Sequence, residues 1–201
     1  PTANRPIITA AQLPPYYAIL DDVDESQLLT NLHKILIRGI KLIQLRLKTL
    51  HTDAIKNFIE KAYPLCKRQG ASLLINSAVK NAEDFAVDGI HLTSRHLMSI
   101  IKRPAFPSGT SEKAHWVAAS CHNLLELQHA QKIGVDFAVL APVLATKTHP
   151  ETEPLGWEQF AKLVSKTNLP VYALGGLSES SLDMTRQAGG QGVAAIRAFL
   201  E

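Results

Sequence analysis

Three polar residues, Gln44, Arg46 and Lys48, alternate with leucines in one short apolar segment. In a β-strand successive side chains point to opposite faces, so the three share one side and the leucines occupy the other. Polar groups on a buried face need partners, because burying them unpaired is costly. An anionic ligand gripped by the guanidinium would be one partner. An internal salt bridge to Asp21 or Asp22 would be another, and the sequence leaves both open.

A second candidate group is Ser120 and His122, which flank Cys121 at the end of another apolar segment. Neighbouring strand residues face opposite ways, so a Cys121–His122 dyad is disfavoured, whereas Ser120 and His122 share a side. A histidine at such a position suits proton transfer, and a packed or capping histidine is the alternative. Asn76 ends a further apolar segment, where its amide would either face a ligand or cap the following turn.

A third group of residues is suited to binding phosphate. Gly175 and Gly176 directly follow an apolar segment, and the lack of Cβ atoms lets an anion approach their backbone N–H groups. The loop after the last apolar segment carries Ile196 and Arg197. A polar loop offers the hydroxyls of Thr146 and Thr148, although exposed polar loops often bind nothing. The eight histidines are scattered, and the sequence predicts no metal site.

These residues all lie at or just after the ends of eight short apolar segments. The segments alternate with amphipathic ones and span residues 16–20, 42–47, 72–76, 89–92, 116–120, 137–140, 171–174 and 192–196. Helices are expected near 25–38, 53–69, 78–86, 95–101 and 157–166, after Asn123 and Ser178, and as a stub after the last strand. Glu126 stands where the acid of a capping box would lie in the helix after Asn123. Such alternation predicts a parallel sheet.

Eight strand–helix units predict closure into a (β/α)8 TIM barrel of the α/β class. An open doubly wound sheet is the alternative, but Leu20-Asp21-Asp22 follows the first strand where a glycine-rich dinucleotide fingerprint would stand. Active sites of such barrels lie at the C-terminal ends of the strands, and the loops after strands seven and eight commonly bind phosphate. The three groups of candidate residues occupy those positions.

The bulk composition is that of one ordinary globular domain, with 201 residues, 46% hydrophobic residues and a net charge of +3. We expect no nucleic-acid partner, because no basic stripe is present, and no membrane segment, because no apolar run is long enough. Two cysteines make no disulfide framework and favour the cytoplasm. Residues 1–15 are interpreted as a Pro-rich approach segment, cut from a longer protein, before a single barrel domain over 16–201.

The ordered series YYAILDD, LIQLRLK, LLIN, DGIHL, SCHN, PVYALGG and GVAAIRAF resembles the thiamine phosphate synthase superfamily over nearly all of residues 16–200. In its synthase branch, a pyrimidine diphosphate bound by the Gln-x-Arg-x-Lys set reacts with a thiazole phosphate. That branch holds magnesium with two aspartates, where this chain has Ser77 and the loop from Thr93 to His96. His149 replaces a family lysine. The resemblance therefore implies weak synthase activity, with magnesium needed only if that activity persists.

The TenI-like branch resembles this chain better at Ser120-Cys121-His122. There a Ser-x-His motif supplies a histidine that moves protons on a thiazole phosphate carboxylate, without a cofactor. The resemblance thus implies a thiazole phosphate tautomerase with His122 as its catalytic residue and a phosphorylated thiazole or thiamine-like ligand. Thiamine phosphate synthase and a non-catalytic ligand-binding module remain alternatives. The resemblance also implies an N-terminally fused Nudix (MutT-type) hydrolase domain, and it leaves a homo-oligomer open.

Overall fold

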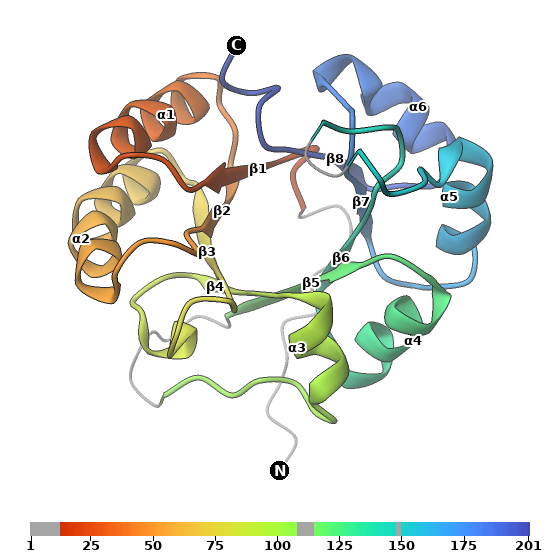
Figure 1. Cartoon of the computed structure of the whole chain (residues 1–201), viewed down its shortest axis with the longest axis horizontal. Coiled ribbons are helices and arrows are strands. Elements are labelled where there is room, and N and C mark those ends of the chain that lie inside the picture. Colours follow the sequence, from red (N-terminus) through yellow and green to blue (C-terminus); the bar gives the residue numbers. More distant parts are fainter. Residues whose placement is uncertain (1–12, 108–114, 148–149) are drawn as a thin grey trace.

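Eight parallel strands close into a barrel in the computed structural model, which describes residues 13–107, 115–147 and 150–201 (Figure 1). The strands are β1 (Tyr16–Asp21), β2 (Leu42–Arg46), β3 (Ser72–Asn76), β4 (Gly89–Leu92), β5 (Trp116–Cys121), β6 (Phe137–Leu140), β7 (Val171–Ala173) and β8 (Gly192–Ala195). Each strand pairs with the next in sequence, and β8 pairs with β1. The predicted TIM barrel is confirmed, and the open-sheet alternative is excluded.

Helices surround the barrel on its outside (Figure 1). They are α1 (Glu25–Ile37), α2 (Thr52–Arg68), α3 (Ser94–Ser99), α4 (Leu124–Ile133), α5 (Gly156–Val164) and α6 (Leu182–Gln187), with a 3-10 turn η3 (Glu179–Ser181) before α6. No helix in the described part of the chain is both long and apolar enough to span a membrane.

Two predicted helices do not form. The segment 78–86 contains only a 3-10 turn, η2 (Ala82–Asp84), because Asn81 takes a left-handed conformation with φ of 54° that ends any helical run. The expected helical stub after β8 is a turn, in which the Leu200 N–H donates to the Arg197 carbonyl at 2.9 Å. The loop after β8 therefore meets the barrel mouth as irregular backbone.

Alternation along the strands divides the apolar residues into two cores. Ile43 and Leu45 belong to the larger core between the barrel and its helices, whereas Leu42 belongs to the smaller core inside the barrel. The inner core is closed by the rings of Tyr17, Phe137 and Tyr172, whose centroids lie 5.3 to 5.7 Å apart in edge-to-face packing. These aromatic residues fill the interior below the pocket described next.

Residues 13–15 pack against the N-terminal end of the barrel. Leu13 is buried in the inner core. The Tyr172 hydroxyl donates to the Pro14 carbonyl at 2.5 Å, and the Val193 N–H donates to the Pro15 carbonyl at 2.9 Å. The last three residues of the expected approach segment thus seal the barrel floor.

Candidate active site

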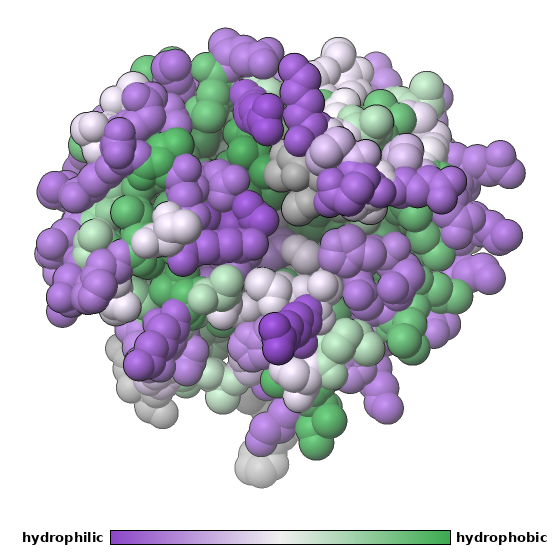
Figure 2. All heavy atoms as spheres, in the orientation of Figure 1, coloured by the Kyte–Doolittle hydropathy of each residue, from purple (hydrophilic) through white to green (hydrophobic). Residues whose placement is uncertain are grey.

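A pocket of about 550 Å³ opens at the C-terminal end of the barrel. Its wall includes residues from all eight strands or the loops that follow them, among them Ile19, Gln44, Asn76, His91, Ser120, Val139, Leu174 and Ala194. Hydrophilic side chains gather near the middle of the face drawn in the space-filling view (Figure 2). The parallel barrel brings the strand ends to one mouth, which is where ligands bind in this fold.

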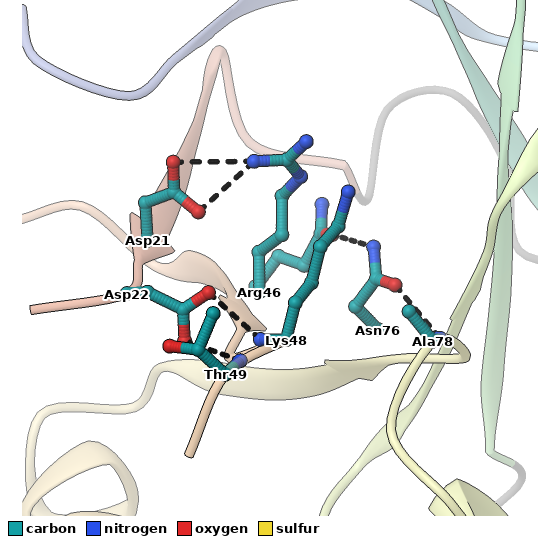
Figure 3. Close-up of polar contacts among 8 residues, drawn as sticks. Asp21, Asp22, Arg46, Lys48, Thr49, Asn76 and Ala78 are labelled. Carbon is teal, nitrogen blue, oxygen red and sulfur yellow. Dashed lines mark hydrogen bonds and ion pairs between the residues drawn. The ribbon is translucent and has the colours of Figure 1, made fainter.

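Arg46 lies in the pocket wall and also forms an ion pair with Asp21 (Figure 3). Its Nη1 lies 2.9 Å from Asp21 Oδ1 and 3.1 Å from Oδ2. Asp22 instead accepts the backbone N–H groups of Lys48 at 2.9 Å and Thr49 at 3.2 Å. The salt bridge considered for Arg46 is therefore present, and because the arginine also lines the pocket, anion binding by Arg46 stays a prediction.

Lys48 takes a different place from Gln44 and Arg46, since it follows the end of β2 and is not part of the pocket wall. Its side chain extends to the same side as that of Arg46 (Figure 3). Partial burial and the neighbouring Arg46 guanidinium lower the pKa of the Lys48 ammonium. Leu47 is buried in the same outer core as Leu45, so the alternation continues past the end of β2 even though Lys48 does not reach the pocket wall.

Gln44 and Asn76 are buried side by side in the pocket wall. Asn76 Nδ2 donates to Gln44 Oε1 at 2.8 Å, and Asn76 Oδ1 accepts the Ala78 backbone N–H at 2.9 Å (Figure 3). Asn76 therefore both caps the turn after β3 and lines the pocket.

His122 also lies in the pocket wall, and its imidazole contacts the carboxylate of Glu126. Glu126 Oε2 lies 3.0 Å from His122 Nδ1 and accepts the His122 backbone N–H at 2.6 Å. A carboxylate accepts only, so Nδ1 carries a proton and the lone pair of the neutral ring is on Nε2. The His122 side chain is 50% exposed and that of Glu126 16%. This arrangement suits a group that accepts and returns a proton.

Glu126 differs from its expected role as the acid of a capping box. Asn123 does cap α4, because its Oδ1 accepts the Glu126 N–H at 3.0 Å. The Glu126 carboxylate, however, turns to His122, one residue before the cap. The local sequence pattern placed the residue correctly but assigned its carboxylate to the wrong N–H.

The loops after β6, β7 and β8 form the side of the pocket where phosphate binding is expected. Gly175, Gly176, Ile196 and Arg197 line it together with Thr146. Thr148 and His149 lie outside the described residues. Three loops therefore bring together those of the expected phosphate-binding residues that the structure describes.

Both positions require glycine, because neither has room for a Cβ atom. Gly175 has φ of 114° and Gly176 has φ of 65°, conformations that other residues rarely adopt. A Cβ on Gly176 would lie 2.5 Å from the Ala145 carbonyl oxygen, and one on Gly175 would lie 2.9 Å from Pro142. The glycines thus allow the loop after β7 to pack directly on the loop after β6.

His91 is a pocket residue that the sequence reasoning missed. It lies within β4, is 1% exposed, and contacts the Tyr17 hydroxyl through Nδ1 at 2.9 Å and the Ser120 hydroxyl through Nε2 at 2.8 Å. Burial, with a smaller effect from Arg46, lowers the pKa of His91 to about 3. The available signal was a single polar residue inside the apolar strand GIHL, a pattern that also fits a core histidine.

Ser77, at the position of one implied magnesium ligand, contacts the first residue of the loop in which the second ligand is implied. Ser77 Oγ accepts the Thr93 backbone N–H at 3.0 Å, which links the ends of β3 and β4. Within the described residues, no three histidine, cysteine or acidic side chains gather as a metal site would need. Magnesium prefers carboxylate oxygens, so one hydroxyl that already accepts a backbone N–H does not fit the two-aspartate site.

Comparisons with known proteins identify the family to which this barrel belongs. The family model described as thiamine monophosphate synthase (TMP-TENI) matches residues 16–199. A putative thiamine-phosphate synthase 2 of Aquifex aeolicus is 34% identical over 194 residues, covering 94% of this chain and 100% of that protein. A thiamine-phosphate synthase of Prochlorococcus marinus is 29% identical over 89% of this chain, which spans only 49% of that relative's length.

Solved structures support the same fold. The thiamine phosphate pyrophosphorylase from Pyrococcus furiosus has a TM-score of 0.67 at 21% identity, covering 91% of this chain and 85% of that one. At this identity the likeness establishes the barrel alone. The family match over residues 16–199, together with the Aquifex relative, confirms the expected superfamily: the chain belongs to the thiamine monophosphate synthase family.

Proposed function

We propose that this protein binds a thiazole phosphate carboxylate and converts one of its tautomers into the other by proton transfer through His122. The observation that carries the proposal is the His122–Glu126 pair in the wall of a pocket that also contains the Gly175-Gly176 loop. A tautomerase needs a proton shuttle and an anchor for the phosphate, and candidates for both line the same cavity. It needs no co-reactant, because one proton leaves a carbon and another is returned elsewhere on the ligand.

In the proposed reaction the phosphate lies against the backbone of Gly175 and Gly176 and near Arg197, which line the pocket together. His122 takes a proton through Nε2 and returns one through the same atom. While it holds the extra proton, the ring is a cation, and the Glu126 carboxylate at 3.0 Å stabilises that charge. Ser120, two residues earlier and within β5, lines the same pocket and would hydrogen-bond the ligand.

Thiamine phosphate synthase activity is the second candidate. The names of the relatives and the presence of Gln44 and Arg46 in the pocket wall favour it. The hydroxyl of Ser77, at a position where a magnesium ligand is implied, opposes it. Pyrophosphate leaves with several negative charges that magnesium normally neutralises. We therefore place tautomerisation first.

The test follows the conversion of the thiazole phosphate carboxylate tautomer by NMR, for the native protein and for His122→Ala. We expect the rate to fall roughly 100-fold or more, the usual contribution of a general acid–base group. His33→Ala, which removes an exposed imidazole on α1, is the matched control and should retain full activity.

Other outcomes would overturn the proposal. Ligand binding without turnover by the native protein would indicate a binding module, and magnesium-dependent release of pyrophosphate as the main activity would indicate a synthase. Full activity of His122→Ala would show that His122 takes no part in the proton transfer.

A fused Nudix domain and a cytoplasmic location remain predictions. Both cysteines, Cys66 and Cys121, are buried free thiols. Burial raises the pKa of each thiol, which keeps it in its unreactive form. These features agree with a reducing compartment.

A further inference from the structure

A buried row of polar side chains crosses the floor of the pocket and ends at Ser120. His91 lies inside this row, between the hydroxyls of Tyr17 and Ser120. Because burial keeps the imidazole uncharged, the ring has one N–H, and one of its two contacts must be a donor and the other an acceptor. Which nitrogen carries the proton decides whether the Ser120 hydroxyl gives or receives a hydrogen bond.

The direction of hydrogen-bond donation along the row is set at its other end, where the row meets the backbone. The Ala78 backbone N–H can only donate, so the atom of Asn76 that it contacts at 2.9 Å is the amide oxygen. The Asn76 NH₂ group is then the donor to Gln44 at 2.8 Å, and the contacted Gln44 atom is its oxygen. Gln44 is 1% exposed, and the end of its amide that remains is again a donor.

Tyr17 continues the row in the same direction. Burial raises the pKa of Tyr17 well above its ordinary value, so the phenol keeps its proton, while a hydrogen bond from the Gln44 side chain acts in the opposite sense by stabilising the oxygen. A phenol oxygen that accepts a hydrogen bond from Gln44 can donate its own proton to another partner. His91 Nδ1 lies 2.9 Å away and accepts it.

We propose that His91 is a positioning residue, held as the Nε2–H tautomer, which donates to Ser120 Oγ and so directs the Ser120 hydroxyl proton into the pocket. The contacts that carry this are the 2.9 Å Tyr17–His91 and 2.8 Å His91–Ser120 distances and the donor order imposed from Ala78. Ser120 then has its hydroxyl proton available to donate to the ligand. The pocket therefore favours a ligand with an oxygen acceptor at that point. The identification of this acceptor as the carboxylate of the ligand rests on the proposed function.

The tautomer can be measured without any ligand or activity. Nitrogen NMR shifts of labelled native protein distinguish an imidazole protonated on Nε2 from one protonated on Nδ1 and from an imidazolium. We expect a single histidine with the Nε2–H pattern, unchanged between about pH 5 and pH 8, that disappears in His91→Gln. An Nδ1–H pattern, or an imidazolium in this range, would overturn the proposal whatever the protein's reaction is.

Binding of a thiazole phosphate carboxylate, measured by calorimetry, tests the consequence for Ser120. His91→Gln keeps an amide N–H near the place of Nε2, whereas His91→Phe keeps the ring but has no donor. We expect about tenfold weaker binding for His91→Phe, near-native binding for His91→Gln, and no further loss when Ser120→Ala is added to His91→Phe. Additive losses would show that the two residues act separately and would contradict the proposal.

Inorganic phosphate serves as the internal control in the same titrations. Its expected contacts are at Gly175 and Gly176, so a correctly folded His91→Phe should bind it as the native protein does. Loss of phosphate binding in that variant would indicate disruption of the pocket, and the ligand-free NMR measurement then decides the proposal. A protein that shows the expected tautomer and binding pattern but no turnover would refute the tautomerase function while leaving the role of His91 intact.

Discussion

Two histidines share one pocket but have opposite surroundings. His122 is half exposed and contacts a carboxylate, whereas His91 is fully buried between two hydroxyls. Burial disfavours the charged form of an imidazole, whereas an exposed imidazole in contact with a carboxylate can exchange protons with a ligand. His122 is therefore suited to carry a proton and His91 to hold a fixed hydrogen-bond pattern. One residue type is thus suited to two tasks, because the burial and the neighbours of the two imidazoles differ.

The Glu126 carboxylate is predicted to matter for rate. Glu126→Gln keeps the size of the side chain but removes the charge that stabilises protonated His122. We expect kcat for tautomerisation to fall by roughly tenfold to a hundredfold, less than the ~10⁴-fold loss known for a fully buried carboxylate–histidine pair, because this pair is partly exposed. Glu158→Gln, an exposed acid in the first turn of α5, is the control. An unchanged kcat in Glu126→Gln would contradict the role of the pair.

At the level of elements, the mouth depends on how the loop after β7 lies on the loop after β6. The Val143 N–H donates to the Leu174 carbonyl at 2.9 Å, and the Leu144 N–H donates to the Gly175 carbonyl at 3.1 Å. These bonds hold the two loops together, and the glycines remove the side chains that would separate them. The side of the pocket where phosphate binding is proposed therefore depends on the pairing of these two loops.

Gly176→Ala is predicted to weaken phosphate binding. The new Cβ would lie 2.5 Å from the Ala145 carbonyl oxygen and would also strain a backbone with φ of 65°. Gly70→Ala is a matched control, because Gly70 has φ of 66° and nothing within 4 Å of its added Cβ. Both variants should lose roughly 1 to 2 kcal/mol of unfolding free energy from the backbone strain. Only Gly176→Ala should also lose affinity for inorganic phosphate in calorimetry, and equal affinities would disprove the loop-packing argument.

Over the whole molecule, the barrel interior has an apolar lower part and a polar upper part. The rings of Tyr17, Phe137 and Tyr172 fill the lower part, and residues 13–15 close the floor beneath them. A histidine placed at the boundary cannot be hydrated, which is the physical reason for its lowered pKa. Folding therefore keeps a neutral imidazole that the unfolded chain would protonate in mild acid.

This difference predicts an acid-sensitive stability. The folded-state pKa of His91 is about 3 against an ordinary 6.5, so its contribution is complete above about pH 6.5 and is lost as the pH falls toward 3. Within this window the unfolded state binds more protons than the folded state. This group should therefore lower the unfolding free energy by about 1.4 kcal/mol for each unit by which the pH falls. Urea denaturation of the native protein and His91→Gln at several pH values checks it. Parallel curves for the two proteins would refute the assignment.

The fold and much of the site follow from local sequence pattern. Strict alternation in β2 predicted that Gln44 and Arg46 face inward, and paired glycines after an apolar run predicted the loop after β7. These properties are local, because strand geometry alone decides which face a residue occupies. The same reasoning was wrong for the helix over 78–86, where the left-handed Asn81 ends the run.

Side-chain contacts between different strands were beyond such reasoning. Tyr17 and His91 are 74 positions apart, and His91 and Ser120 are 29 apart, yet each pair is within hydrogen-bond distance inside the barrel. The registers between adjacent strands set which inward residues reach the same height, and the sequence pattern of a single strand contains no such information. Periodicity therefore places a side chain on the inner face, while closure of the barrel decides which partner it meets there and whether it stays charged.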